Sequence, residues 1–287
     1  ERAFADCVAL KRLVVGAGVV ACEPPVFEYE GGWTNEEGEA WCGTMSGLPA
    51  LEYLEVHSQA FMEAFEGGFP SLANLVLGEE IEWIPQCAFC DCEALREVTI
   101  PGSVVCVDSC AFRNCEALRE VTIPDSVEFV GEYAFFDCTN IERLVIGSGV
   151  AGCAGPVFGW HDPLDGREFY GLPNLRELTL GSPEFVEAFC IDGYDYKEWR
   201  EIRTTYPKAT SVTLNGRFTG IPGDFLGRFP ALETVTLPEG IAEIPAEAFA
   251  GCVSLLELEI PDTVTNVGER AFADCVALKR LVVGAGV

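Results

Sequence analysis

The sequence predicts a repeat solenoid, one continuous stack of turns of mostly 23 residues with a parallel β-sheet on one face. Three observations predict it: a block that recurs at a fixed period, a column of short strands, and an apolar turn motif between them. Residues 92–101 and 115–124 both read Cys-Glu-Ala-Leu-Arg-Glu-Val-Thr-Ile-Pro, and residues 138–147 read Cys-Thr-Asn-Ile-Glu-Arg-Leu-Val-Ile-Gly, each block 23 residues after the last. Such a period predicts units that bury their apolar faces against their neighbours.

The strands are expected at the Val-Thr-Ile and Leu-Val-Ile segments, whose first and third residues should face the core while the middle residue faces solvent. Most intervals between successive strands are 23 residues, and the longer ones of 34 and 41 residues are expected to hold loops that leave the stack unbroken. The expected strand starts are Leu13, Leu54, Leu75, Val98, Val121, Leu144, Leu178, Val212, Val235, Leu258 and Leu281. The expected outward column is Val14, Glu55, Val76, Thr99, Thr122, Val145, Thr179, Thr213, Thr236, Glu259 and Val282.

The rest of each turn is predicted from its stop signal and its apolar spacing. A Pro or Gly ends the strand, and a Val-x-x-Ile/Val step then leads into Ala-Phe-x-x-Cys. The spacing of the apolar residues in that motif favours one tight helical or 3₁₀ turn on the other face of the solenoid.

The combined pattern of Cys-x-x-Leu-x-x-Val-x-Ile-Pro and Val-x-x-Ile/Val-Gly-x-x-Ala-Phe resembles the BspA-like leucine-rich repeat family, the type also named after Treponema pallidum. It covers more than half of the chain closely, in residues 1–19, 81–150 and 221–287. The resemblance implies a leucine-rich-repeat-type solenoid, often secreted or on cell surfaces, that acts in adhesion or protein binding. It implies no catalytic machinery.

A longer period lies over the short one. Residues 1–19 recur unchanged as residues 269–287, whereas the internal cousin at 132–150 matches them at only 11 of 19 positions. Residues 1–131 and 132–268 also run through the same order of features, so they are interpreted as diverged half-repeats, and 269–287 as the start of the next identical 268-residue unit. We therefore expect this chain to be a window on a tandem array, in which Val287 is followed by the residues that follow Val19.

The charge excludes one class of partner. Acidic residues outnumber basic ones 46 to 18, for a net charge of −28, and such a surface repels nucleic acid. Cations and basic proteins remain compatible with it, and so does a plain solvated surface. We expect no membrane span, since the longest apolar runs are only a few residues.

The cysteines are interpreted mainly as structure. Cys7, Cys92, Cys115, Cys138, Cys252 and Cys275 share one repeat position and are predicted to form a buried ladder of free thiols, because their side chains point in parallel. A disulfide between Cys22 and Cys42 is one hypothesis for the first insertion, and a bridge between Cys87 and Cys110 is a weaker one.

Sites of chemistry are sparse. The two histidines, His57 and His161, lie in different turns without a nucleophile motif, so we expect no enzyme and no catalytic residues. No cofactor and no specific metal site are expected. Weak Ca²⁺ binding is the one possibility considered, at the acidic loops Asp162, Asp165, Glu168 and Asp192, Asp195, Glu198.

The insertions contain aromatic residues at a density that is unusual for a surface, so they are expected either to cover the edge of their own solenoid or to contact another chain. Tyr194, Tyr196 and Trp199 are predicted to lie in a short helix, since Tyr196, Trp199 and Ile202 have helical spacing. The candidate partner-contact residues are Phe27, Tyr29, Trp33, Trp41, Phe158, Trp160, Tyr170, Tyr196 and Trp199.

Two functions follow from the sequence. The first is a structural protein, a segment of a long tandem array that forms an extended acidic fibre or surface filament, with insertions that contact neighbouring copies. The alternative is a secreted or surface adhesin that binds proteins through its sheet face. Both place the protein outside the cell or on its surface.

Overall fold

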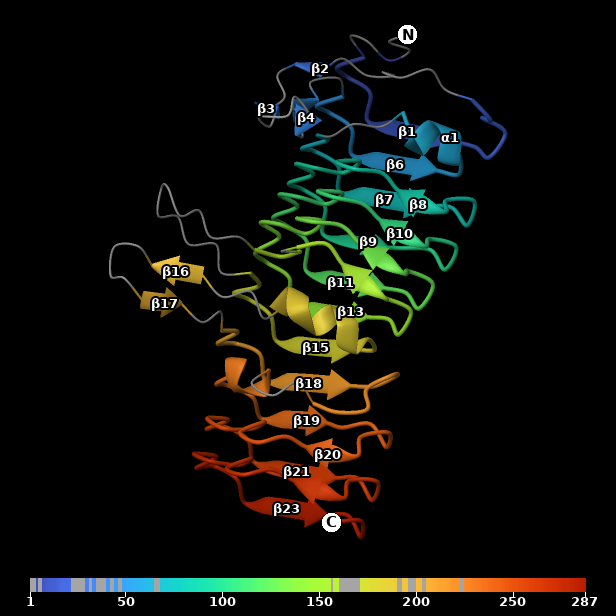
Figure 1. The fold of residues 1–287 in the computed structure, drawn as a ribbon. Helices are drawn as coiled ribbons and strands as arrows, with labels where there is room; N and C mark the ends of the chain where they lie inside the picture. Colours follow the sequence, from blue (N-terminus) through green and yellow to red (C-terminus); the bar gives the residue numbers. More distant parts are fainter. Residues whose placement is uncertain are drawn as a thin grey trace.

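The structure is a computed structural model and describes residues 4, 7–21, 29–30, 33–34, 40–41, 44–45, 48–64, 68–155, 157–159, 171–189, 193–195, 200–202, 205–221 and 225–287. Its turns stack along one axis, with the two termini at opposite ends of the stack (Figure 1). The predicted solenoid with a parallel sheet is confirmed.

The main sheet is the column of strands at the expected positions. Every predicted start lies in one of its strands, and the strands pair in parallel without a slip, as where Leu13 pairs with Leu54 and Val121 with Leu144. Hydrogen bonds join them in three sets, which Figure 1 shows as one continuous stack. The strands are β1 (Arg12–Val15), β6 (Tyr53–Val56), β7 (Asn74–Leu77), β9 (Glu97–Thr99), β11 (Glu120–Ile123), β13 (Arg143–Ile146), β15 (Glu177–Leu180), β18 (Ser211–Leu214), β19 (Thr234–Thr236), β21 (Glu257–Ile260) and β23 (Arg280–Val283).

A second sheet, which the sequence did not predict, is formed by the last two residues of the Val-x-x-Ile/Val step in the regular turns. Its strands are two residues long, and one set pairs in the order β14-β12-β10-β8. Ile84, Val107 and Val130 occupy its inward positions and are fully buried. The strands are β8 (Trp83–Ile84), β10 (Cys106–Val107), β12 (Phe129–Val130), β14 (Gly152–Cys153), and, as a separate pair, β20 (Glu243–Ile244) and β22 (Asn266–Val267).

The Ala-Phe motif of the regular turns forms the tight turn that its spacing suggested, with 3₁₀-type bonds between residues three apart, but it does not continue as a regular helix. In the turn around Phe112, Cys110 and Asn114 have φ of 57° and 59°. The backbone N–H groups alternate in their bonds: Arg113 donates to Cys110 O within the turn at 3.1 Å, and Phe112 donates to Ala134 O of the next turn at 2.8 Å. A continuous helix would use all these N–H donors within the turn. The alternating pattern instead leaves every second N–H free to donate to the next turn, and these hydrogen bonds join adjacent turns. Asn and Asp fit the second left-handed position, since they tolerate this region better than most residues.

Among the described residues, regular helical segments occur in turns that lack the complete Ala-Phe-x-x-Cys motif. In the first of them, Ser58 caps the helix by accepting a hydrogen bond from Phe61 N at 3.1 Å. The segments are α1 (Gln59–Met62), η1 (Pro183–Phe189) and η2 (Leu226–Arg228).

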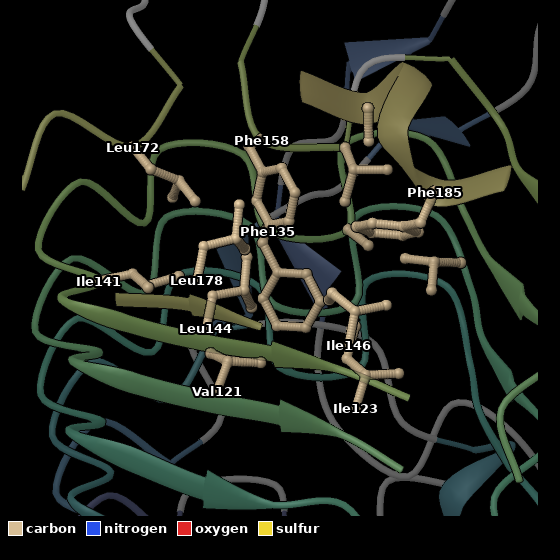
Figure 2. Packing of buried hydrophobic residues seen from close by; sticks show 14 of the residues in the cluster. Val121, Ile123, Phe135, Ile141, Leu144, Ile146, Phe158, Leu172, Leu178 and Phe185 are labelled. Atoms are coloured by element: carbon tan, nitrogen blue, oxygen red, sulfur yellow. The ribbon is translucent and has the colours of Figure 1, made fainter. Parts of the chain in front are cut away.

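The core is a continuous column of apolar side chains between the two sheets and the Ala-Phe turns. Figure 2 shows Phe135 and Phe158 packed over Leu144 and Ile146 of β13. The phenylalanines of successive turns stack on one another, with centroids 5.4 Å apart for Phe89 and Phe112 and 5.3 Å apart for Phe112 and Phe135. Each turn therefore buries its ring against two neighbours, as expected of a solenoid whose turns are not stable alone.

Two insertions contain hairpins that leave the stack. In the first, β2 (Tyr29–Glu30) pairs antiparallel with β5 (Thr44–Met45), and β3 (Trp33–Thr34) pairs with β4 (Ala40–Trp41). In the second, β16 (Gly193–Asp195) pairs antiparallel with β17 (Arg200–Ile202) and projects to one side of the solenoid (Figure 1). The helix predicted there is wrong, because Gly193 and Asp195 are poor helix formers while the aromatic and β-branched residues of the segment favour strands.

Candidate binding surfaces

The outward face of the main sheet carries ion pairs that run from strand to strand. Glu142 accepts from Arg119 at 3.0 Å and lies 3.4 Å from Arg176, while Arg143 lies 3.6 Å from Glu177 one column away. In-register pairing places these residues in columns, so their side chains meet across adjacent turns. All are largely solvent-exposed, and such pairs contribute about 0–1 kcal/mol each. The face is therefore a surface of mixed charge, in which these charged side chains pair with one another across adjacent turns.

The middle column of this face is lined by β-branched residues. Thr122 lies in register with Thr99 on one side and Val145 on the other, and Thr179, Thr213 and Thr236 continue the column. The flanking column is charged at Glu97, Glu120, Arg143 and Glu177, so the threonines form one line and not a flat two-column surface.

A small titratable cluster lies at the N-terminal end of the same face. His57 Nε2 is 3.0 Å from Glu55 and its Nδ1 is 3.3 Å from Glu80. Tyr53 donates to Glu55 at 2.7 Å, and the Arg12 guanidinium lies over the Tyr53 ring at 4.2 Å from its centroid. The hydrogen bond to Glu55 raises the pKa of His57 above its ordinary value, and Glu80 adds to this effect. The hydrogen bond from Tyr53 lowers the pKa of Glu55. This set of groups can hold a proton and offers no nucleophile.

The predicted cysteine ladder is a column of free thiols that is fully buried in the interior turns, at Cys92, Cys115, Cys138 and Cys252. Each of the last three donates its S–H to a backbone carbonyl of the preceding turn, as Cys138 does to Phe112 O at 3.1 Å. Burial raises the pKa of Cys115 well above its ordinary value, so the thiolate is disfavoured. Cys275 is half-buried and Cys7 is exposed. The interior column packs and does not react.

The other cysteine hypotheses have mixed outcomes. Cys87 is in a disulfide while Cys110 is free, so the bridge between these two is wrong. Their shared turn position points their side chains in parallel, as in the ladder. Cys22 and Cys42 lie outside the described residues.

The aromatic candidates are only partly placed by the structure. Tyr29, Trp33 and Trp41 lie in hairpin strands, where Trp33 pairs with Trp41 across the second hairpin. Phe158 is a correction: it is 1% exposed and stacks on Phe135, so it belongs to the core and is not available to a partner. Its position continues the Phe column, which the insertion around it concealed. Phe27, Trp160, Tyr170, Tyr196 and Trp199 lie outside the described residues.

Sequence reasoning missed an exposed apolar strip on the second sheet. Trp83, Cys106 and Phe129 are register partners on its outward face, and Val105 lies beside Cys106. The exposed fractions are 36% for Trp83, 45% for Val105 and 40% for Phe129, and Cys106 is half-buried. We call these four residues the second-sheet strip. The signal was the apolar residue before the inward Ile or Val in three successive steps, at a position that was treated as variable.

Within the described residues, no group of three or more His, Cys, Asp and Glu side chains is arranged to hold a metal ion. The acidic loops considered for Ca²⁺ lie largely outside that part of the chain, and His161 lies outside it as well. None of the described helices is long and apolar enough to cross a membrane.

Comparison with known proteins identifies the repeat. The model of the BspA type leucine rich repeat region matches residues 60–159 and 206–287, in six copies. Among solved structures, a leucine-rich cell surface protein from Faecalibacterium prausnitzii is 19% identical, with 82% of this chain and 77% of that one covered at a TM-score of 0.33.

A leucine-rich repeat protein from Treponema pallidum is 18% identical, with coverage of 90% and 91% and a TM-score of 0.32. One from Bacteroides ovatus is 14% identical, with coverage of 93% and 81% and a TM-score of 0.38. No curated protein matches the sequence.

Proposed function

Because this chain belongs to the BspA-type leucine-rich repeat family, we propose that it is a structural segment of a tandem solenoid array at the cell surface or outside the cell. The array forms an extended acidic rod, and its insertions contact neighbouring copies or other proteins. No catalytic step is part of this function.

The observation that supports the array is the repeated 19-residue block. In residues 1–19 the block pairs with the turn that follows it, since Leu13 lies opposite Leu54. In residues 269–287 the same sequence pairs with the turn that precedes it, since Leu281 lies opposite Leu258. One turn sequence therefore accepts a neighbour on either side, which is what continuation of the stack through this block requires.

The dimensions and charge of the rod follow from the same unit. One 268-residue unit holds ten main-sheet strands, and at about 4.8 Å per strand it advances roughly 48 Å. With a charge of −28 over these 287 residues, copies repel one another sideways unless cations or basic groups bridge them. Such a rod stays extended and soluble.

The intact mass of the native protein tests the proposal. An array gives a mass of several units and particles whose length grows by roughly 48 Å per unit in electron micrographs. A native protein of 31.1 kDa would overturn it.

A second candidate is a protein-binding module that uses the main-sheet face. The in-register column around Thr122 supports it, because a regular line of β-branched side chains offers a flat contact between the charged columns. A monomer of residues 1–287 that binds a host or matrix protein, and loses binding on Thr122→Lys, would favour this function; unchanged binding would reject it.

A further inference from the structure

The second-sheet strip is an exposed apolar surface that the fold does not require. Trp83, Cys106 and Phe129 occupy one column of the sheet. In the separate C-terminal pair β20 and β22, the equivalent repeat position holds Glu243 and Asn266, which form strands of the same length. Polar side chains are therefore compatible with this backbone, and the apolar residues of the N-terminal turns need another explanation.

The size of the strip limits what can cover it. An aromatic side chain has about 150–250 Å² of surface, so the exposed fractions of Trp83 and Phe129 amount to roughly 70–90 Å² each. With Val105 and Cys106 the strip offers on the order of 250 Å², far less than the ~800 Å² that each partner of a stable complex buries. A short segment of chain fits this area, and a second folded copy does not.

The charge around the strip selects the kind of segment. The second-sheet strands and their adjoining turns, residues 78–90, 101–113, 124–136 and 147–159, contain seven acidic residues and one basic residue, Arg113. Glu82 and Glu128 are both exposed and lie one on each side of Val105 in the neighbouring column. A bound segment therefore meets an apolar line bordered by carboxylates.

The edge of the sheet at β8 is already closed. The side-chain carbonyl of Gln59 accepts from Glu82 N at 2.9 Å and from Trp83 N at 3.3 Å, and its amide donates to Trp83 O at 3.2 Å. Because this amide takes the place of a neighbouring strand, the backbone groups at this edge already have hydrogen-bond partners. A bound segment therefore lies across the outward face of the sheet and does not pair as an additional strand.

We propose that the second-sheet strip binds short basic peptide segments that carry two apolar side chains about 10 Å apart, the separation of Trp83 and Phe129 across two strand spacings. In an extended polyproline-type segment, residues three apart lie on one side at about 9.3 Å, which matches this separation. The surface is independent of the tandem array, so intact mass and peptide binding test different things.

The probe is the peptide Lys-Lys-Phe-Lys-Lys-Phe-Lys, titrated against residues 1–287 at physiological ionic strength. The charge-matched control peptide has serine in place of both phenylalanines. We expect binding of the first peptide to be about tenfold tighter, because the apolar anchors supply the difference. Equal binding of the two peptides would show attraction to a polyanion only and would overturn the proposal.

The site is checked with Trp83→Asn/Phe129→Asn, which introduces the residue found at the equivalent repeat position, Asn266. The matched control is Val76→Asn, a valine that is 40% exposed on the main sheet. The double variant should lose about tenfold in affinity, and the control should retain the affinity of the parent protein. The reverse result, or no change in either variant, would reject the strip as the site.

A footprint gives a readout that does not depend on the variants. Cys106 is a half-buried free thiol within the strip, and Cys7 is an exposed free thiol elsewhere. The bound peptide should slow alkylation of Cys106 by iodoacetamide and leave Cys7 unchanged. Sedimentation of the protein alone completes the test: self-association that the double variant abolishes would make a second copy the occupant and refute the peptide.

Discussion

Replacing Gly149 with alanine tests whether adjacent turns are held together by backbone contact. Gly149 lies in the loop after β13, where an added Cβ would overlap the carbonyl group of Asp125 in the preceding turn. The same loop is fixed by Ser148 N, which donates to the Asp125 carboxylate at 2.6 Å. The alanine methyl group cannot move aside, because it meets backbone atoms on the other turn.

The cost is estimated from these contacts. Forcing an extra carbon into a packed contact costs about 1–3 kcal/mol, and losing the hydrogen bond from Ser148 adds about 1 kcal/mol. The free energy of unfolding should therefore fall by about 2–4 kcal/mol. Gly102 provides the control, because an added Cβ there meets no atom within 4 Å. Gly102→Ala should be neutral or stabilise by up to about 1 kcal/mol through the unfolded chain.

Urea denaturation followed by circular dichroism measures both variants. The midpoint for Gly149→Ala should fall clearly below that of the parent protein, and the midpoint for Gly102→Ala should equal or exceed it. If the two variants unfold at the same urea concentration, the contact between the loops does not stabilise the stack, and the reasoning from close approach is wrong.

Three further results are expected. The pKa of His57, followed by NMR, should lie above 6.5 and should fall in Glu55→Gln. Because the pKa of His57 is raised in the folded protein, its pairing with Glu55 stabilises the protein fully below the unfolded pKa, and this stabilisation is lost as the pH rises through the folded pKa. An unshifted pKa of His57 would contradict the pairing. Folded protein of residues 1–287 treated with a thiol reagent should be modified at Cys7 and protected at Cys115, and labelling of Cys115 without unfolding would disprove its burial. Glu142→Gln should change the free energy of unfolding by no more than about 1 kcal/mol despite its two arginine partners, and a larger loss in urea denaturation would mean that the ion pairs act as a network.

The main sheet could be predicted from sequence because its alternation is long enough to detect. In β11, Val121 and Ile123 are buried while Thr122 is exposed, which is the period of two that the letters show. The insertion between β13 and β15 did not obscure this, because Arg143 still pairs with Glu177 in the same register across the 34-residue interval. Strand pairing depends on the strands alone, so loop length leaves it unchanged.

The second sheet and the left-handed backbone of the Ala-Phe turns could not be predicted in this way. A strand of two residues such as Phe129–Val130 has no alternation to detect, and its pairing is imposed by the turn above and below. The left-handed backbone at Cys110 and Asn114 is also set by hydrogen bonds to the next turn, which local spacing does not encode. Asn114 was the one usable signal, since Asn and Asp recur where φ must be positive.

Inward and outward positions of the repeat differ in how strongly the stack constrains their residue types. Inward positions such as Val107 and Phe112 contact the turns on both sides, so each is constrained twice by the stack. Outward positions contact solvent and one or two neighbours, and their residue types differ between turns with the same backbone. Because Trp83 and Asn266 occupy equivalent outward positions of their turns, the apolar choice at Trp83 is not a requirement of folding. Residues that break the pattern of their own column are therefore the places in this solenoid where binding should be sought first.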